Sequence, residues 1–173
     1  LDGLDALSSD LLIKALADPH PGVRENAVRL SETRTTPAVE DAVLKLVTDA
    51  EAKVRQQLAF SLGAFPPSPE VGQGLATLLL NDNEDIFITS AALSSALPHQ
   101  AQLIDAVLAS HDPALPQLTL TLSEIALASK NLDSVAALLN PVFSVALTSP
   151  SQENSDAVDQ ILDLLNRLET SVA

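Results

Sequence analysis

The sequence predicts an all-α protein: a right-handed α-α superhelix of about five helix pairs that forms a single domain over residues 1–173. The first observation behind this prediction is a motif, an Asp followed five positions later by Val-Arg, that occurs twice with a period of 31 residues. The two copies are Asp18, Val23 and Arg24, and Asp49, Val54 and Arg55. A fixed period of this size is typical of helix pairs that stack into an array.

The composition is the second observation. Apolar residues make up 46% of the chain, but Phe is the only aromatic type and occurs four times. Leu, Ala and Val carry the apolar fraction, and they favour close helix packing over a pocket walled with rings. With 173 residues, the chain is long enough for a core that removes roughly 70% of the unfolded surface from water.

Charge and missing residue types exclude several function classes. A net charge of −14 and a pI near 4.3 oppose nucleic-acid binding, because affinity for a phosphate backbone rests on Lys and Arg. The absence of Cys excludes disulfides, thiolate metal sites and covalent haem attachment. The apolar runs are too short for a membrane span, and no targeting signal is visible. A chain that opens with LDGL and contains no Met is expected to be a segment of a longer protein.

Caps and prolines place the helices of the first three pairs. Ser8, Ser9 and Asp10 offer N-caps for a helix that ends near Ala17. Pro residues suit the first turn of a helix, so Pro21 and the Thr36-Pro37 step each mark a helix start. The expected helices after the first are 21–32, 36–48, 54–64, 70–80 and about 84–97.

The repeat is harder to follow beyond Pro98. Residues 99–110 read as a first helix, whereas 115–129 fit both the strand period and the helix period, with the repeat context favouring helix. Asn131 caps a further helix, and Pro141 predicts a kink or break near Asn140. Residues 149–155 read as a polar loop, and 156–170 as an amphipathic helix that can cap the array.

The Asp and Arg of the motif are expected to have a structural role. In a stacked array each hairpin leaves part of its apolar stripe for its neighbours, and a guanidinium near the turn can reach the Asp of its own or an adjacent unit. We therefore expect a ladder of Asp18, Arg24, Asp49 and Arg55. In the third unit Asn81 takes the Asp position, Ile86 the Val position and Phe87 the Arg position. The ladder is expected to stop there, with Phe87 packed between layers.

This pattern of Asp, Val-Arg and small or apolar residues resembles the short form of the HEAT repeat. A more specific resemblance lies in the segments LDGL, ALADPHPGVRENAVRLSE, VRQQLAFSLG and AALSS. They are similar to the HEAT segment of large secreted multidomain proteins of planctomycetes, over about the first 100 residues. That resemblance implies a place between a dehydrogenase-like β-propeller and a c-type cytochrome domain, and a secreted or periplasmic location.

A search for catalytic, metal or cofactor motifs finds none. The histidines His20, His99 and His111 lack ligand spacing and read as turn or cap residues. The acidic stretch 81–86 lacks the Gly and Glu of a calcium loop, so we expect a solvated turn that favours the following helix. No nucleophile elbow, dinucleotide fingerprint or phosphate loop is present. We therefore expect no catalytic residue, no metal and no cofactor in this segment.

A binding surface remains as the candidate site. The second helix of each pair lines the concave side of such an array, and the period aligns its outward positions. These positions are Glu25, Asn26 and Arg29; Gln56, Gln57 and Phe60; and Ile88, Thr89 and Ala92. Phe60 and Ile88 are apolar where solvent is expected. They either form part of a docking groove or pack against a neighbouring unit, and the sequence leaves both interpretations open.

Three functions are compatible with these observations. The first is a non-catalytic scaffold or spacer that binds a protein partner or positions flanking domains of the same chain. The second, implied by the resemblance, is an interface-forming part of a secreted redox enzyme whose chemistry lies in other domains. The third, a repeat enzyme resembling the HEAT-like lyases and glycosylases, is the weakest, because a glycosylase of this type needs a basic concave face and the net charge is −14.

Overall fold

The computed structural model describes residues 7–110, 115–131, 133–140, 159 and 162–163, and its regular structure there is helical, with no strand. The all-α fold class is therefore confirmed. The chain divides into two compact units, residues 1–106 and 107–173, which are described separately. No helix in the described part of the chain is both long enough and apolar enough to cross a bilayer.

The first unit contains three helical hairpins. They are α1 (Ser9–Leu16) with α2 (Pro21–Ser31), α3 (Pro37–Leu44) with α4 (Ala52–Ser61), and α5 (Pro69–Asn81) with α6 (Ile86–Ser94). Two short 3-10 helices follow the second helices: η2 (Leu62–Ala64) after α4 and η3 (Leu97–His99) after α6. The next helix, α7 (Gln100–Ser110), crosses the division between the two units.

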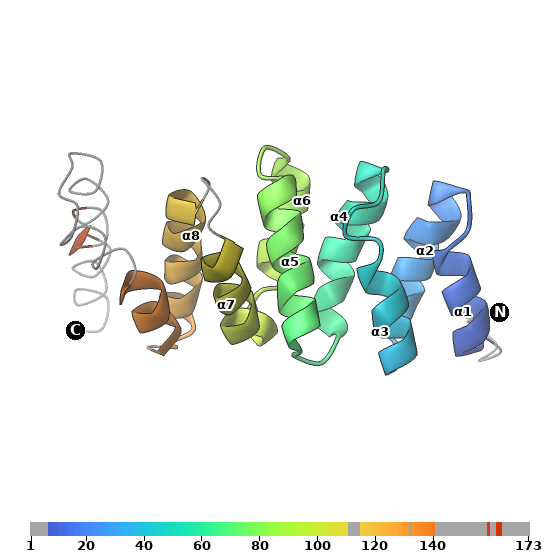
Figure 1. Ribbon diagram of the computed structural model, residues 1–173, viewed down its shortest axis with the longest axis horizontal. Helices are drawn as coiled ribbons and strands as arrows, with labels where there is room; N and C mark the ends of the chain where they lie inside the picture. Colours follow the sequence, from blue (N-terminus) through green and yellow to red (C-terminus); the bar gives the residue numbers. More distant parts are fainter. Residues whose placement is uncertain (1–6, 111–114, 132, 141–158, 160–161, 164–173) are drawn as a thin grey trace. The chain divides into compact units, whose positions relative to one another are not determined.

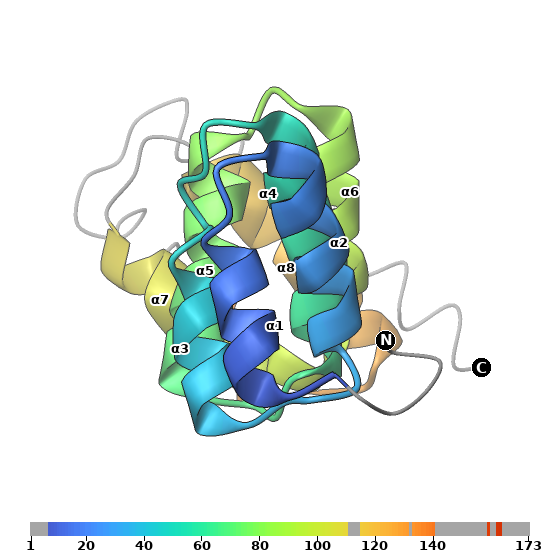
Figure 2. The same ribbon diagram turned by 90° about the vertical axis from the view of Figure 1, so that its right-hand side faces the viewer.

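These hairpins form two layers. The first helices α1, α3 and α5 lie in one layer, and the second helices α2, α4 and α6 lie in the other (Figures 1 and 2). Within the second layer α2 packs against α4, and α4 packs against α6; within the first, α1 packs against α3. Consecutive hairpins therefore share most of their interface through their second helices.

Local sequence explains where the helices begin. The Ser8 and Ser68 hydroxyls accept the backbone N–H three residues on, at 3.2 and 3.1 Å, and so cap α1 and α5. His20 caps α2 through Nδ1, which accepts the Gly22 N–H at 3.1 Å. Asp85 caps α6 by accepting two backbone N–H groups, at 2.9 and 3.2 Å. The predictions of a cap or turn role for His20 and for the acidic stretch before α6 are confirmed.

The core lies between the layer of first helices and the layer of second helices. Leu and Val side chains from both layers are fully buried there, and small Ala residues on the second helices allow those helices to approach closely. The residues with no exposed surface include Leu12, Val28, Val43, Val54, Leu58, Leu62, Leu75, Leu78, Ala91 and Ala92.

One expected helix is shorter than predicted. α3 ends at Leu44 rather than at Thr48, and tight turns follow, in which Leu46 N–H donates to the Val43 carbonyl at 2.9 Å and Asp49 N–H to the Leu46 carbonyl at 3.0 Å. Hydrogen bonds of this short type tighten the last turn of a helix and satisfy its end carbonyls. Leu46 is buried although it lies beyond the helix. The apolar spacing therefore continues past the end of α3, which is why the sequence predicted a longer helix.

In the second unit, α8 (Leu115–Ala128) is a helix, which decides between the two periods that its sequence allowed. The Asn131 side chain accepts the Ser134 N–H at 3.1 Å, and a helical segment follows at 133–140, so the predicted cap is confirmed. The predicted kink at Pro141 and the loop 149–155 lie outside the described residues. So do His111 and most of the expected helix 156–170.

Candidate functional site

The second helices are held to their neighbours by a ladder of Arg and Asp residues. Arg24 donates from Nε and Nη2 to the two carboxylate oxygens of Asp49, at 2.7 and 2.8 Å. Its Nη1 donates to the backbone carbonyl of Asp18 at 2.9 Å. The two paired side chains are only 15% and 5% exposed. One guanidinium thus joins the turn of its own hairpin to the turn of the next.

This pairing shifts the pKa of both groups. The hydrogen bond from Arg24 is the largest cause that lowers the pKa of Asp49 below its ordinary value, and burial opposes it. The same hydrogen bond raises the pKa of Arg24, again against burial. Both shifts favour the charged pair, as expected for a bidentate contact.

The next rung repeats this geometry with a different acceptor from the one predicted. Arg55 donates to both carboxylate oxygens of Asp82, at 2.9 and 2.6 Å, and to the backbone carbonyl of Asp49 at 2.6 Å. The hydrogen bond with Asp82 is the largest cause that raises the pKa of Arg55. The prediction that Asn81 takes the Asp position was therefore wrong, because Asp82 lies 33 residues after Asp49, two more than the motif period of 31.

The structure also corrects the positions that follow. Counted from the N-cap of each second helix, Ile88 takes the position of Val54 and Thr89 that of Arg55. Phe87 is 65% exposed and does not pack between layers, whereas Ile88 is only 1% exposed. Thr89 donates to the carbonyl of Asp85, at 2.9 Å, within its own hairpin. Among the described residues, Asp82 is therefore the last acceptor of a motif Arg.

Asp18 lies at the other end of this series. Its carboxylate accepts the His20 N–H at 2.8 Å, and among the described residues no Arg or Lys pairs with it. The ladder residues thus do not all have the same role: Asp18 contributes its carbonyl to Arg24, while its carboxylate has no basic partner in that part of the chain.

The candidate binding residues on α2, α4 and α6 differ in exposure. Ile88 and Ala92, expected to point outward, are buried at 1% and 0% exposure, so they belong to the core. Their helix packs against α4 and α5. The remaining residues are exposed or half-buried, and we call them the second-helix surface: Glu25, Asn26, Arg29, Gln56, Gln57, Phe60 and Thr89.

Phe60 is the large apolar side chain of the second-helix surface, and half of it is exposed. Its backbone carbonyl accepts the Ser95 hydroxyl at 3.0 Å, which brings the end of α6 against the end of α4. Leu97, two residues after Ser95, is 60% exposed. Exposed apolar side chains are therefore carried on two adjoining helix ends.

Several polar residues of this surface are already engaged within their own helices. Asn26 donates to the Gly22 carbonyl at 2.7 Å and accepts from Arg29 at 3.1 Å. Thr89 donates to the carbonyl of Asp85 at 2.9 Å. These contacts limit the freedom of the Asn26, Arg29 and Thr89 side chains, so those side chains have less ordering left to undergo on binding.

Sequence reasoning missed a second set of contacts between hairpins. Ser61 donates to a Glu32 carboxylate oxygen at 2.7 Å and accepts from Gln57 at 3.1 Å. Ser95 donates to the Ala59 carbonyl at 2.7 Å. The available signal was a Ser near the end of each second helix, at positions 31, 61 and 95, all of them buried.

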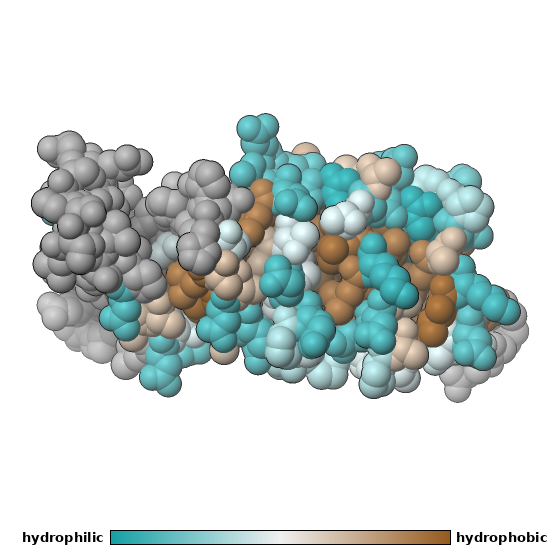
Figure 3. All heavy atoms as spheres, viewed as in Figure 1, coloured by the Kyte–Doolittle hydropathy of each residue, from teal (hydrophilic) through white to brown (hydrophobic). Residues whose placement is uncertain are grey.

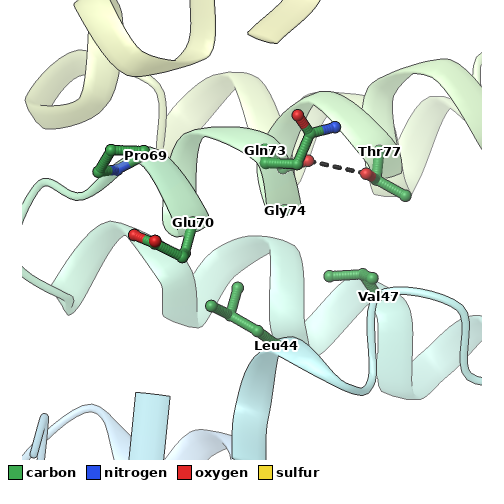
Figure 4. A pocket seen from close by; sticks show the side chains of 7 residues that line it. All are labelled: Leu44, Val47, Pro69, Glu70, Gln73, Gly74 and Thr77. Carbon is green, nitrogen blue, oxygen red and sulfur yellow. Dashed lines mark hydrogen bonds between the residues drawn. The ribbon is translucent and has the colours of Figure 1, made fainter. Parts of the chain in front are cut away.

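The opposite, first-helix side of the first unit carries an open groove between α3 and α5 (Figure 4). Apolar surface is visible in this region between hydrophilic side chains (Figure 3). The groove has a volume of about 480 Å³ and is lined by Leu44, Val47, Pro69, Glu70, Gln73, Gly74 and Thr77. Among these lining residues Glu70 is the one ionisable group, which suits contact with an apolar side chain better than catalysis.

His99 differs from its expected turn or cap role. It ends η3, but its side chain is fully buried, with Nε2 lying 3.0 Å from the Leu62 carbonyl oxygen. Nδ1 has no hydrogen-bond partner among the described residues. Burial lowers the pKa of His99, so the ring is neutral at pH 7 and Nε2 donates. In the described part of the chain no group of three or more His, Cys, Asp or Glu could hold a metal ion.

Comparison with known proteins agrees with this geometry. A family model described as HEAT repeats matches residues 9–96, just over half of the chain and the whole of the three hairpins. No curated protein and no solved structure matches the chain. The match covers both rungs of the Arg–Asp ladder, and the chain belongs to the HEAT repeat family.

Proposed function

We propose that this HEAT repeat segment is a non-catalytic scaffold that binds a protein partner on the second-helix surface, with Phe60 as the central apolar contact. The observation that carries this proposal is the 50% exposure of Phe60 on a helix held from both sides by other second helices. Aromatic side chains are enriched at protein–protein interfaces, and a few of them contribute most of the binding free energy.

The surrounding contacts support this proposal because they make the surface rigid. α4 is tied to α2 through Arg24 and Asp49 at one end and through Glu32 and Ser61 at the other. Ser95 ties α6 to α4 next to Phe60. A surface that is already ordered before binding loses little conformational entropy on binding.

The chemistry of the described residues favours binding over catalysis. HEAT repeats are generally protein-interaction modules without catalytic activity, and their stacked helices provide extended binding surfaces. Asn26 and Thr89 of the second-helix surface hydrogen-bond to backbone carbonyls of their own hairpins rather than in a nucleophile–base pair. The partner we propose is therefore a protein or a flanking domain, recognised by shape and by scattered polar contacts.

Photo-crosslinking tests this proposal, with Phe87 as the matched control. Phe87 is also an exposed Phe on a second helix, but it lies in the first turn of α6. The photoreactive residue p-benzoylphenylalanine is placed at position 60 or at position 87 of the full chain, in its native host. We expect a protein adduct from position 60 and none from position 87. Equal adducts from both positions would contradict a specific surface.

Binding of the purified adduct partner provides the quantitative test. Calorimetry should show that Phe60→Ala weakens Kd at least tenfold, which corresponds to about 1.4 kcal/mol. Phe87→Ala should change Kd less than twofold. Both variants should keep the far-UV circular dichroism of the parent chain, because both side chains are exposed. Unchanged affinity of Phe60→Ala would remove Phe60 from the binding surface.

The interface role in a secreted redox enzyme is the alternative function. It rests on the resemblance of the first 100 residues to planctomycete multidomain proteins, and the family comparison supports only the HEAT repeats. A secreted or periplasmic location rests on the same resemblance and stays a prediction. Reading the coding sequence on both sides of this segment tests both, since a propeller upstream and a CxxCH motif downstream are required.

A further inference from the structure

The outer side of the first hairpin has the features of a repeat interface, and no hairpin of the described residues packs on it. The α1–α2 hairpin stands at the front of the first unit in Figure 2, with the second and third hairpins behind it. Consecutive hairpins in this unit are joined twice in the same way, from Arg24 to Asp49 and from Arg55 to Asp82. Each acceptor Asp receives its Arg from the hairpin that precedes it in the chain.

Asp18 is held in the same local geometry as Asp49. The Oδ1 atom of Asp18 accepts the His20 N–H at 2.8 Å, and the Oδ1 atom of Asp49 accepts the Glu51 N–H at 3.0 Å. The backbone carbonyl of each Asp also accepts Nη1 of the Arg six residues later, at 2.9 and 2.6 Å. The two turns differ in what binds the carboxylate: a preceding Arg binds that of Asp49, and none among the described residues binds that of Asp18.

The apolar contacts show the same difference. Val23 and Val54 occupy the same motif position, yet Val23 is 40% exposed and Val54 is fully buried. Each valine lies on the second helix of its hairpin, and each hairpin is followed by another. Among the described residues, only Val54 has a hairpin before it, with α2 packed against its helix α4. The extra burial of Val54 therefore indicates what a preceding hairpin would cover at Val23.

We propose that this end surface, formed by the Asp18 carboxylate and Val23, binds a further helical hairpin of the same repeat class joined ahead of α1. The second helix of that hairpin carries an apolar residue followed by Arg in its first turn, as α2 and α4 do. The Arg donates two hydrogen bonds to the carboxylate of Asp18, and the helix covers Val23. Charge complementarity favours this occupant, because an apolar surface alone would leave a half-buried carboxylate without a cation.

A tandem duplication of residues 8–35 within the full chain tests this inference. The duplicated protein runs from residue 1 to 35 and then from 8 to 173, so the first copy supplies an Arg24 ahead of the second copy's Asp18. In the duplicated protein, the first copy of α2 is joined to the second copy of α1 by residues 32–35 followed by Ser8. This connection has five residues, as does the natural connection 32–36 between α2 and α3. Asp18→Asn is the informative change, because the Asn oxygen can still accept the His20 N–H.

Urea unfolding, followed by far-UV circular dichroism, gives the readout. In the parent chain Asp18→Asn should leave the midpoint unchanged, whereas Asp49→Asn should lower it. In the duplicated chain Asp18→Asn in the second copy should lower the midpoint about as much as Asp49→Asn does. Arg24→Met in the first copy should remove that effect. An equal response to Asp18→Asn in both chains would overturn the proposal.

Two further measurements use the parent chain alone. Amide hydrogen exchange should be faster in α2 than in α4, since Val23 on α2 is 40% exposed and Val54 on α4 is fully buried. Equal protection would show that the end surface is already covered. Sedimentation velocity tests whether a second copy of the chain occupies this surface instead. A dimer of the parent chain that Asp18→Asn dissociates would show that a second copy fills the surface, and would overturn the hairpin as the occupant.

Discussion

Two glycines of α5 provide a sharp test of how closely the hairpins pack. Gly72 and Gly74 are both buried within this helix. A Cβ added at Gly72 would lie 2.5 Å from the backbone carbonyl carbon of Gln102, on α7. A Cβ added at Gly74 would lie 2.8 Å from Cδ2 of Leu44, the free end of a flexible side chain at the groove between α3 and α5. The same Gly→Ala change therefore meets backbone at one position and a movable methyl group at the other.

The expected magnitudes follow from these neighbours. Ala is a better helix former than Gly by about 1 kcal/mol, which both variants gain. At Gly72, carbon atoms that normally stay about 3.5–4.0 Å apart must separate by roughly 1 Å, and overpacking of this kind costs up to about 3 kcal/mol. At Gly74, a new rotamer of Leu44 costs on the order of 1 kcal/mol. Gly72→Ala should thus lower the free energy of unfolding by about 2 kcal/mol, and Gly74→Ala should leave it nearly unchanged.

Urea unfolding monitored at 222 nm measures both variants, since the chain has no Trp or Tyr for fluorescence. Gln73 lies between the two glycines and is exposed, so Gln73→Gly and Gln73→Ala provide the helix-propensity difference without a packing term. After that correction, Gly72→Ala should fall below Gly74→Ala by about 2 kcal/mol. Equal midpoints, or a stabilised Gly72→Ala, would refute the close approach of α5 and α7.

Acid titration of stability tests the two shifted pKa values, and a further substitution tests a contact between hairpins. Because Arg24 lowers the pKa of Asp49, the charged pair stabilises the fold above the ordinary pKa of 3.8, and this stabilisation is lost as pH falls through the folded-state pKa. Asp49→Asn should make the urea midpoint fall less steeply in acid. An unchanged fall of the midpoint in acid would contradict this pairing. The lowered pKa of His99 makes the unfolded chain take up a proton near 6.5 while the folded chain does not, so stability should fall as pH drops below 6.5. His99→Gln, whose amide can still donate to the Leu62 carbonyl, should flatten the pH dependence of the urea midpoint between pH 6.5 and the folded-state pKa; an unchanged slope would show that His99 does not titrate on unfolding. Removing the buried hydroxyl of Ser95 with Ser95→Ala should lower the free energy of unfolding by about 1–2 kcal/mol, and a thermal melt without a shift would argue against that contact.

Local spacing accounts for the part of this protein that could be predicted from sequence. The 31-residue period identified the hairpins, and the Asp and Arg of the motif were recognised as ladder candidates because helix starts and turn residues are local features. The cap roles of His20 and Asn131 follow from the same cause. Each needs only backbone groups within three residues along the chain.

Which residues meet across hairpins was decided by the tertiary structure. Asp82 lies 33 residues after Asp49 instead of 31, and it is the acceptor of Arg55. The N-cap of α6 follows Asp82 by three residues rather than two, so that Phe87 is exposed and Ile88 is buried. The sequence predicts a turn role for His99, but its Nε2 atom lies 3.0 Å from the Leu62 carbonyl oxygen, which follows the second helix of another hairpin. Such contacts depend on the rotation and axial offset of one helix against another. Sequence period determines which face of a helix is apolar, whereas the packing of neighbouring helices determines which residues on that face are covered.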